Sequence, residues 1–213
     1  MPRTRVKICG LTRPEDAQAA VHAGVDAIGL VFYPPSARAV NWEEAAQLTQ
    51  GLPPFVTVVG LFVDPLGEEV ERVIQNTRID LLQFHGDESD GFCSGFGKPY
   101  MKAIRMKSGL DLRVEISRYP GSSGILLDAW HPEEQGGTGE TFDWKRVPAE
   151  LKSSIVLAGG LTVSNVSLAL AEVQPYAVDV SSGVEEKKGI KDAAKMMAFL
   201  KEVEDYDNRI RRV

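Results

Sequence analysis

The feature that most constrains this chain is a pattern in which short apolar runs alternate with segments of helical periodicity about eight times. Each run is rich in β-branched or other apolar residues and is bounded by Gly, Pro, Asp or Ser, as strands usually are. Between the runs, apolar residues recur at the i, i+3 and i+4 spacing of a helix face. The predicted strands lie at residues 5–9, 27–32, 56–63, 80–84, 100–105, 124–128, 154–158 and 177–182.

Helices are predicted between most of these strands, with signals at their ends. Asn41 and Thr162 are expected N-caps, and Gly24 and Gly51 are expected to stop the helices that precede them. Residues 107–121 have mixed periodicity and give no clear helix. The clearest helical segments are residues 13–24, 41–51, 67–77, 162–173 and 191–204.

The alternation of strands and helices predicts the fold class. Strands that are apolar at successive positions suit a parallel sheet covered on both faces, and parallel strands need right-handed crossover connections. About eight units of roughly 25 residues fit a closed (β/α)8 TIM barrel better than an open doubly wound sheet, which usually has five or six strands. The sequence therefore predicts a single α/β domain over residues 1–213, in which residues 205–213 form a tail that need not be ordered.

Composition excludes several classes of protein. A net charge of -6 argues against nucleic acid as a partner, because phosphates are usually met by a basic face. No apolar stretch approaches the roughly 20 residues that span a bilayer, so no membrane partner is expected. Two cysteines cannot build a disulfide framework and the N-terminus lacks a secretion signal, which together predict a cytoplasmic protein. Whether the chain is a monomer or a homodimer cannot be read from the sequence.

The first predicted strand ends in Cys9, followed at once by a glycine. Free cysteine is among the most buried residue types, so a packing role is the alternative to a chemical one. In a (β/α)8 barrel, however, active groups lie where strands end and their loops begin, which places Cys9 on the functional face. Lys7, two residues earlier, is expected to point into the same end of the barrel and to favour a thiolate on Cys9.

The loops after the last two strands have the features of a phosphate site. Gly159 and Gly160 allow an anion to approach the backbone closely, and Ser181, Ser182 and Gly183 offer N–H and hydroxyl donors before an expected short helix. This fold commonly binds phosphate at these two loops. A glycine pair alone often marks an ordinary turn, so the prediction depends on the two loops together.

Three more side chains at strand exits are candidates, each with a plainer alternative. Asp128 ends an apolar strand and could act on a ligand or accept a hydrogen bond within an Asx-turn. Arg38 could bind a carboxylate through two hydrogen bonds or be an ordinary surface arginine. His85 could contact a ligand or bond to the backbone. The long loop that contains Gly136, Gly137 and Gly139 is expected to cover the site.

Metals and cofactors are not expected. No histidine pair has the spacing of metal ligands, and no Cys/His cluster occurs. The glycines of the long loop lack the strand–turn–helix setting of a dinucleotide site.

Several motifs resemble, in order and spacing, those of the phosphoribosylanthranilate isomerase family of tryptophan biosynthesis. The resemblance spans roughly residues 6–200, and the ordered set of motifs is far more specific than any one of them. Two departures are Ala37 and Ala39, where the family usually has proline and an aromatic residue. A proline often found before the glycine at position 189 is also missing. The motifs are "KICGLT", "LQFHGDE", "LLDAW", "GGTGETFDW", "LAGGL", "DVSSGVE" and "GIKD".

The resemblance implies a (β/α)8 barrel without metal or cofactor that converts N-(5-phosphoribosyl)anthranilate to 1-(2-carboxyphenylamino)-1-deoxyribulose 5-phosphate by an Amadori rearrangement. It implies that Cys9 is the general base, Asp128 the general acid, Arg38 the contact to the anthranilate carboxylate and Asp179 a polar substrate contact. It also assigns phosphate contacts to three residues, Gly160, Ser182 and Gly183.

Two alternatives remain at this point. The ribotide isomerase of histidine biosynthesis performs the same rearrangement, but that family tends to have aspartates at both catalytic strand ends and two phosphate sites. A non-catalytic phosphate-binding barrel would be favoured if Cys9 or Asp128 were missing, and both are present.

Overall fold

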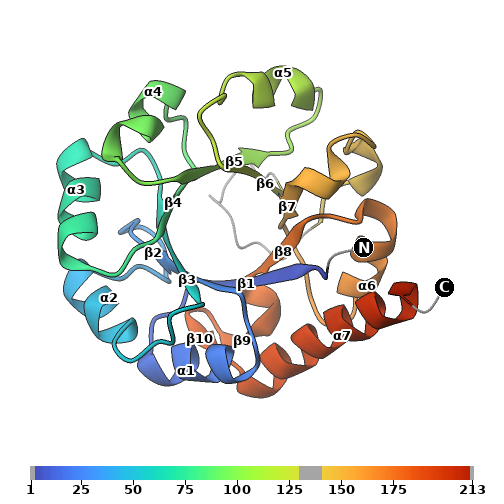
Figure 1. Cartoon of the computed structure of the whole chain (residues 1–213), viewed down its shortest axis with the longest axis horizontal. Coiled ribbons are helices and arrows are strands. Elements are labelled where there is room, and N and C mark those ends of the chain that lie inside the picture. Colours follow the sequence, from blue (N-terminus) through green and yellow to red (C-terminus); the bar gives the residue numbers. More distant parts are fainter. Residues whose placement is uncertain (1–2, 130–140, 212–213) are drawn as a thin grey trace.

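The computed structural model describes residues 3–129 and 141–211, and within them it forms a closed barrel of parallel strands. The strands follow one another around the barrel in chain order, and the helices form an outer ring (Figure 1). This arrangement confirms the predicted (β/α)8 barrel. The barrel strands are β1 Arg5–Cys9, β2 Ala27–Val31, β3 Thr57–Phe62, β4 Leu81–Phe84, β5 Tyr100–Arg105, β6 Gly124–Asp128, β7 Ile155–Leu157 and β8 Ala177–Val180.

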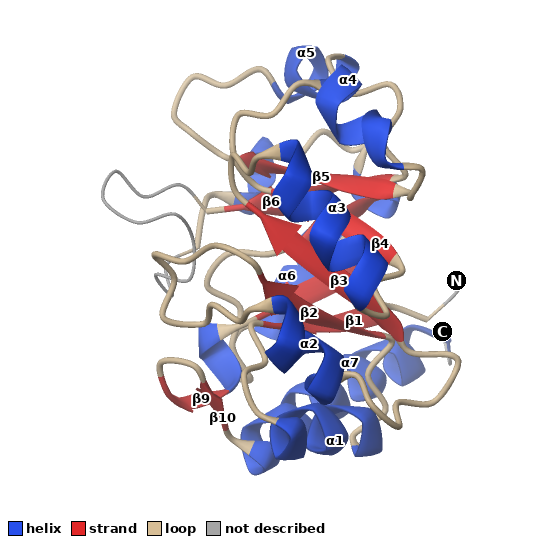
Figure 2. Ribbon diagram, turned by 90° about the vertical axis from the view of Figure 1, so that its left-hand side faces the viewer, coloured by secondary structure: helices blue, strands red, loops and turns tan. Residues whose placement is uncertain are grey.

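The helices lie outside the barrel, as the side view also shows (Figure 2). Short 3-10 turns and one small antiparallel pair, β9 Glu185–Lys187 with β10 Ile190–Lys191, complete the described chain. The 3-10 turns are η1 Ser94–Phe96, η2 Trp144–Arg146, η3 Lys152–Ser154 and η4 Ser182–Val184. The helices are α1 Pro14–His22, α2 Trp42–Leu48, α3 Gly67–Asn76, α4 Asp90–Cys93, α5 Leu112–Ser117, α6 Val166–Val173 and α7 Ala193–Arg211.

Strand register separates the inside of the barrel from its outside. β1 closes the barrel by pairing with β2 and with β8, where Lys7 lies beside Asp179. Because side chains alternate along a strand, Val6 and Ile8 face the helices and belong to the main core, whereas Lys7 and Cys9 face the barrel interior. The inward-facing side chains of β1 are thus a lysine and a cysteine, whereas its outward-facing side chains are apolar.

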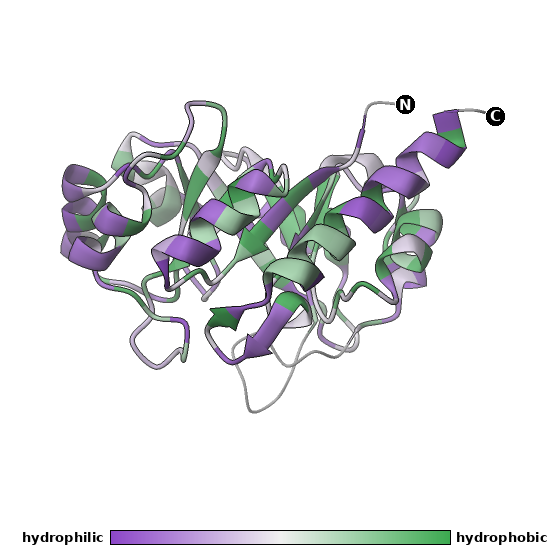
Figure 3. Cartoon of the chain, turned by 90° about the horizontal axis from the view of Figure 1, so that it is seen from below, coloured by the Kyte–Doolittle hydropathy of each residue, from purple (hydrophilic) through white to green (hydrophobic). Residues whose placement is uncertain are grey.

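The main core lies between the barrel and the helices. Phe84 of β4 has its ring centroid 5.8–6.1 Å from those of four other aromatic residues, Phe62, Phe92, Phe96 and Tyr100. These contacts hold α4 and η1 against the barrel. Figure 3 shows hydrophilic and hydrophobic residues alternating along the helix that leads to the C-terminus, as expected for a helix with one buried face.

The predicted helix ends are partly correct. Asn41 caps α2 by accepting the Glu44 N–H at 2.8 Å, and the Glu44 carboxylate accepts the Asn41 N–H at 2.8 Å. Gly24 and Gly51 follow the ends of α1 and α2 with φ of 92° and 75°. The expectation for Thr162 is wrong: α6 begins at Val166. The Thr162 N–H instead donates to the Asn165 side chain at 2.8 Å, in the turn before the helix.

The connections between strands depart from the regular pattern in one place. Residues 107–121, whose periodicity is mixed, do contain a helix, α5, whose first turn is capped by the Asp111 carboxylate. In the described part of the segment between β6 and β7 there are only the 3-10 turns η2 and η3, so the regular alternation with α-helices is interrupted there.

The prediction of a tail from residue 205 is wrong for the residues that the structure describes. α7 continues to Arg211, beyond the amphipathic segment 191–204. Tyr206 donates from its hydroxyl to the Leu170 carbonyl at 3.1 Å, and Asp207 accepts the Thr4 N–H at 2.6 Å. These contacts to α6 and to the entry of β1 order the last turns. None of the described helices is both long and apolar enough to cross a membrane.

Candidate functional site

A cavity of about 390 Å³ opens where the barrel strands end. Its wall includes Cys9 from the end of β1, Asp128 from the end of β6, and residues from the loops after β2, β4, β7 and β8. Nearly all of the predicted site residues line this cavity: Cys9, Arg38, His85, Asp128, Gly159, Gly160, Asp179 and Ser182. The residues predicted from their positions at the strand ends therefore lie together in space.

Cys9 is buried, with 5% of its surface exposed. Burial raises the pKa of its thiol, and although Lys7 and Lys191 favour the thiolate, they do not outweigh it. Lys7 thus favours the thiolate, as the sequence predicts, but burial outweighs its effect on the pKa of Cys9. The free-energy cost of removing the thiolate from water exceeds its attraction to the two nearby ammonium groups. The Ser181 hydroxyl donates to the Cys9 carbonyl at 3.0 Å and fixes the backbone of this strand end.

Lys7 reaches into the barrel as predicted, and it pairs with Asp179. The Lys7 ammonium lies 3.0 Å from Asp179 Oδ1, and both side chains are buried. Burial opposes the charge on Lys7, but the paired Asp179 carboxylate raises its pKa, so Lys7 stays a cation. Asp179 thus lines the cavity while one of its oxygens already receives a hydrogen bond from the protein.

Asp128 faces the cavity beside His85. The Ala129 N–H donates to Asp128 Oδ1 at 2.9 Å, a local turn contact of the kind that the plainer interpretation of this aspartate expected. The other oxygen, Oδ2, lies 3.1 Å from His85 Nε2. That separation is an ion-pair distance, but His85 Nε2 has no aligned hydrogen-bond partner among the described residues. Asp128 therefore combines a turn contact with a second oxygen placed at the cavity.

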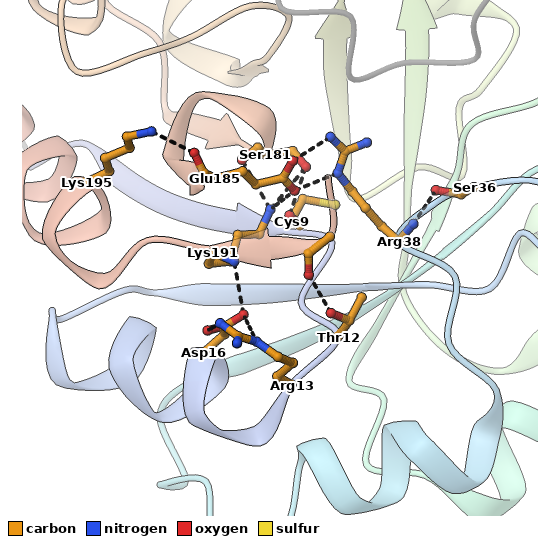
Figure 4. Close-up of polar contacts among 11 residues, drawn as sticks. Cys9, Thr12, Arg13, Asp16, Ser36, Arg38, Ser181, Glu185, Lys191 and Lys195 are labelled. Atoms are coloured by element: carbon orange, nitrogen blue, oxygen red, sulfur yellow. Dashed lines mark hydrogen bonds and ion pairs between the residues drawn. The ribbon is translucent and has the colours of Figure 1, made fainter. Parts of the chain in front are cut away.

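Arg38 is held by an acidic residue that the sequence analysis gave no role. Its Nε and Nη2 donate to the two oxygens of Glu185 at 2.7 and 2.8 Å (Figure 4). Lys191 lies 2.8 Å from the same carboxylate. Burial opposes the charge on Glu185, but Arg38 and Lys191 outweigh it and hold the pKa of Glu185 below its ordinary value.

Glu185 and Lys191 were not predicted as site residues, although both lie within motifs of the chain. Glu185 ends the motif "DVSSGVE" and Lys191 lies within "GIKD", in the small β9–β10 pair that follows β8. Both side chains are buried and charged. A charged residue in a short loop gives no sign in the sequence that it is buried, so only the fold identifies these two as parts of the site.

The predicted phosphate loops after β7 and β8 lie against each other. Gly159 and Gly160 have φ of +83° and +63°, a region that favours glycine. A side chain on Gly183 would come within 1.9 Å of the Leu161 carbonyl oxygen. Gly183 does not line the cavity itself, but its lack of a side chain lets the two loops touch. Ser182 lines the cavity at the start of η4.

Some predictions concern residues that the structure does not describe. The expected cover loop with Gly136, Gly137 and Gly139 lies outside the described residues. Within residues 3–129 and 141–211, no group of three or more His, Cys, Asp or Glu side chains is arranged to hold a metal ion.

Comparison with known proteins gives a consistent result. A family model described as N-(5'-phosphoribosyl)anthranilate (PRA) isomerase matches residues 6–202. The N-(5'-phosphoribosyl)anthranilate isomerase of Azotobacter vinelandii is 55% identical over 203 residues, which cover 95% of this chain and 98% of that protein.

Solved structures resemble the whole barrel. The phosphoribosyl anthranilate isomerase of Thermotoga maritima matches with a TM-score of 0.86 and 38% identity, covering 95% of this chain and 99% of that one. A structure of such an isomerase in complex with reduced 1-(o-carboxyphenylamino)-1-deoxyribulose 5-phosphate matches with a TM-score of 0.80 and 36% identity over the same shares. A third, of monomers generated from the dimeric Thermotoga maritima enzyme, has a TM-score of 0.77, 34% identity and the same coverage.

Proposed function

The chain belongs to the N-(5'-phosphoribosyl)anthranilate isomerase family, and from that premise we propose that Asp128 is the general acid and Cys9 the general base of an Amadori rearrangement. The enzyme is an isomerase of tryptophan biosynthesis. The substrate in this proposal is N-(5-phosphoribosyl)anthranilate and the product is 1-(2-carboxyphenylamino)-1-deoxyribulose 5-phosphate. The observation that carries the proposal is that Cys9, Asp128 and the loops suited to phosphate line one cavity.

The first step opens the ribose ring. Asp128 donates its proton to the ring oxygen, the bond between that oxygen and C1' breaks, and the nitrogen lone pair forms a protonated Schiff base with C1'. The Asp128 carboxylate formed in this step accepts a hydrogen bond from the Ala129 N–H at Oδ1, and the His85 ring lies next to Oδ2. Donors placed where negative charge develops stabilise the transition state.

The second step moves a proton at C2'. The Cys9 thiolate removes it, and the electrons of the C–H bond form a double bond between C1' and C2', which neutralises the Schiff base and gives an enolamine. The enolamine then gains a proton at C1' and loses one from the C2' hydroxyl, so the ketone product is an isomer of the substrate. Acid and base catalysis each contribute about 10² to 10⁴-fold in such reactions.

The surroundings of Cys9 both oppose and favour its thiolate. Burial keeps the thiol protonated in the free chain, while the Lys7 ammonium, held as a cation beside Asp179, favours the thiolate when the proton leaves. The active fraction is then the thiolate fraction, and activity should rise as pH increases toward and above the ordinary thiol pKa of about 8.5.

The rest of the cavity supports binding of the two ends of this substrate. Arg38, which Glu185 orients through two hydrogen bonds, is assigned to the anthranilate carboxylate. Gly159, Gly160 and Ser182 are assigned to the phosphate, with Gly183 acting by bringing their loops together. His85 and Asp179 are assigned to the sugar between them. The protein is proposed to act as a monomer or homodimer, which sedimentation would distinguish.

The direct test of this function follows the fluorescence of freshly prepared phosphoribosylanthranilate. The chain should accelerate the loss of substrate, and Asp128→Asn should lower kcat at least about 10²-fold while folding normally, because an amide cannot donate the acid's proton. Unchanged substrate decay with the wild-type chain would overturn the proposed reaction. An Asn variant that keeps more than half of the turnover would remove Asp128 from the role of acid.

A further inference from the structure

Gln83 is a buried polar residue inside the barrel to which the proposed mechanism gives no role. It lies in β4, has no exposed surface, and shares the inward face of its strand with His85 two residues later. Its side chain forms part of the cavity wall. Elsewhere on that wall, the neighbouring strand β3 contributes the apolar side chain of Leu61.

The amide of Gln83 is only half satisfied. Its Nε2 lies 3.3 Å from His85 Nδ1, and both groups are buried. Its Oε1 has no hydrogen-bond partner among residues 3–129 and 141–211. A buried amide that leaves an oxygen unpaired costs stability that an apolar side chain of similar size would not. Packing alone therefore does not account for a glutamine here, and the contact to His85 is what the amide supplies.

That contact determines where the histidine carries its proton. An amide N–H can donate to Nδ1 only if Nδ1 is unprotonated, and a neutral imidazole must then carry its proton on Nε2. Nε2 is the nitrogen that lies 3.1 Å from Asp128 Oδ2. The N–H is not aligned for a hydrogen bond in the ligand-free chain, as is common for catalytic contacts before substrate binds.

We propose that Gln83 is a positioning residue that fixes His85 as the Nε2–H tautomer, so that its ring presents a donor to Asp128. This inference rests on the proposed role of Asp128 as the acid. When Asp128 gives up its proton, the carboxylate formed gains the Nε2–H as a donor in addition to the Ala129 N–H. A histidine held by a partner on its far nitrogen is a frequent way to orient the near one.

The opposite amide orientation makes a different prediction. With Oε1 toward His85, Nδ1 would have to carry the proton and Nε2 would be an acceptor facing Asp128. The two arrangements differ in which ring nitrogen is protonated, which nitrogen-15 NMR measures directly.

The first experiment is carried out on the wild-type chain without substrate. The chain contains three histidines, so histidine-labelled protein gives few signals, and the His85 signal is the one that His85→Asn removes. The expected result is a protonated Nε2 and an unprotonated Nδ1 at pH 7.5. A protonated Nδ1 would overturn the proposal, whatever the enzyme's activity toward phosphoribosylanthranilate.

The second experiment uses variants at position 83. Gln83→Met keeps the length of the side chain and removes the donor, while Gln83→Glu can only accept and should move the proton to Nδ1. Both should lower kcat about 10 to 100-fold with KM changed less than twofold, as for residues that orient a catalytic group. Gln75→Met, on the exposed face of α3, is the matched control and should change neither value.

The two variants separate positioning from packing. If Gln83→Met keeps the Nε2–H tautomer and full kcat, the amide does not set the tautomer and the proposal fails. If a variant does not fold, the wild-type NMR measurement still decides. Loss of kcat in both variants together with a changed His85 tautomer supports the proposal.

Discussion

Cys9 and Cys93 are both buried thiols, but the exit of β1 and the helix α4 place them in different surroundings. Burial raises the pKa of both, that of Cys93 to about 12. Cys93 packs in the main apolar core with no exposed surface, where Lys102 favours its thiolate but burial, with the carboxyl groups of Glu88 and Asp90, outweighs it. Cys9 instead lines the cavity and has Lys7 beside it.

The comparison shows that burial does not distinguish a reactive thiol from a packing one. Both cysteines would be classed as buried hydrophobes by their exposure. Each thiol has a lysine that favours its thiolate, Lys7 at Cys9 and Lys102 at Cys93, so what differs is access to a cavity that also contains Asp128. We therefore expect changes at the two cysteines to affect different quantities, activity at Cys9 and stability at Cys93.

The largest effect on kcat is expected when the proposed base, Cys9, is replaced. Cys9→Ser should lower kcat at least about 10²-fold, because a hydroxyl is a far poorer base than a thiol at neutral pH. Cys93→Ser makes the same chemical change in the core and should keep kcat within twofold. The measurement is the kcat of both variants under steady-state conditions. An equal loss of kcat in the two variants, or a Cys9→Ser variant that keeps most of its kcat, would contradict the proposed difference between the two cysteines.

A smaller effect is expected from removing the ammonium beside Cys9. Lys7 favours the thiolate, so Lys7→Met should raise the pKa of Cys9 further and move the rise of kcat/KM to higher pH. A shift of one pH unit would leave about tenfold less thiolate at neutral pH. Lys201→Met, on the exposed side of α7, serves as the control. A pH profile that does not move with Lys7→Met would show that this ammonium does not tune the thiol.

The smallest effect concerns stability at Cys93. Cys93→Ala should lower the free energy of unfolding by about 1 to 3 kcal/mol, as for other truncations in a packed core, and leave kcat unchanged. Because the pKa of Cys93 is higher in the folded chain, its contribution to stability is complete below the ordinary thiol pKa of about 8.5 and declines as pH rises toward about 12. Urea unfolding from pH 8 to pH 10 should therefore show a steeper loss of stability in wild type than in Cys93→Ala; equal slopes would contradict this.

The fold was predictable because its signal is local. Apolar strands and amphipathic segments of regular length indicate a βα repeat, and the barrel then follows from the number of units. The errors occurred where tertiary contacts decide the outcome. The last turns of α7 are ordered by Tyr206 and Asp207, which contact α6 and the entry of β1, and no local pattern predicts those contacts.

The site was predictable only as far as strand exits identify it. Cys9 and Asp128 end their strands, so the fold alone brings them to one face. Their electrostatics depend on partners far away in the chain: Asp179 is 172 residues from Lys7, and Glu185 is 147 residues from Arg38. The net direction of the Cys9 pKa shift does not follow from the sequence for the same reason, because the depth of burial that outweighs Lys7 is a property of the closed barrel.

The central claim, that Cys9 is the catalytic thiol and Cys93 is not, is tested most directly by alkylation with iodoacetamide followed by peptide mapping. Activity should be lost in proportion to the labelling of Cys9, at a rate that rises with pH as thiolate forms, and a product analogue should protect Cys9. Cys93 should remain unlabelled in the folded chain at the same reagent concentration. Full turnover after complete labelling of Cys9, or a loss of activity that follows the labelling of Cys93, would show that Cys9 is not the catalytic thiol.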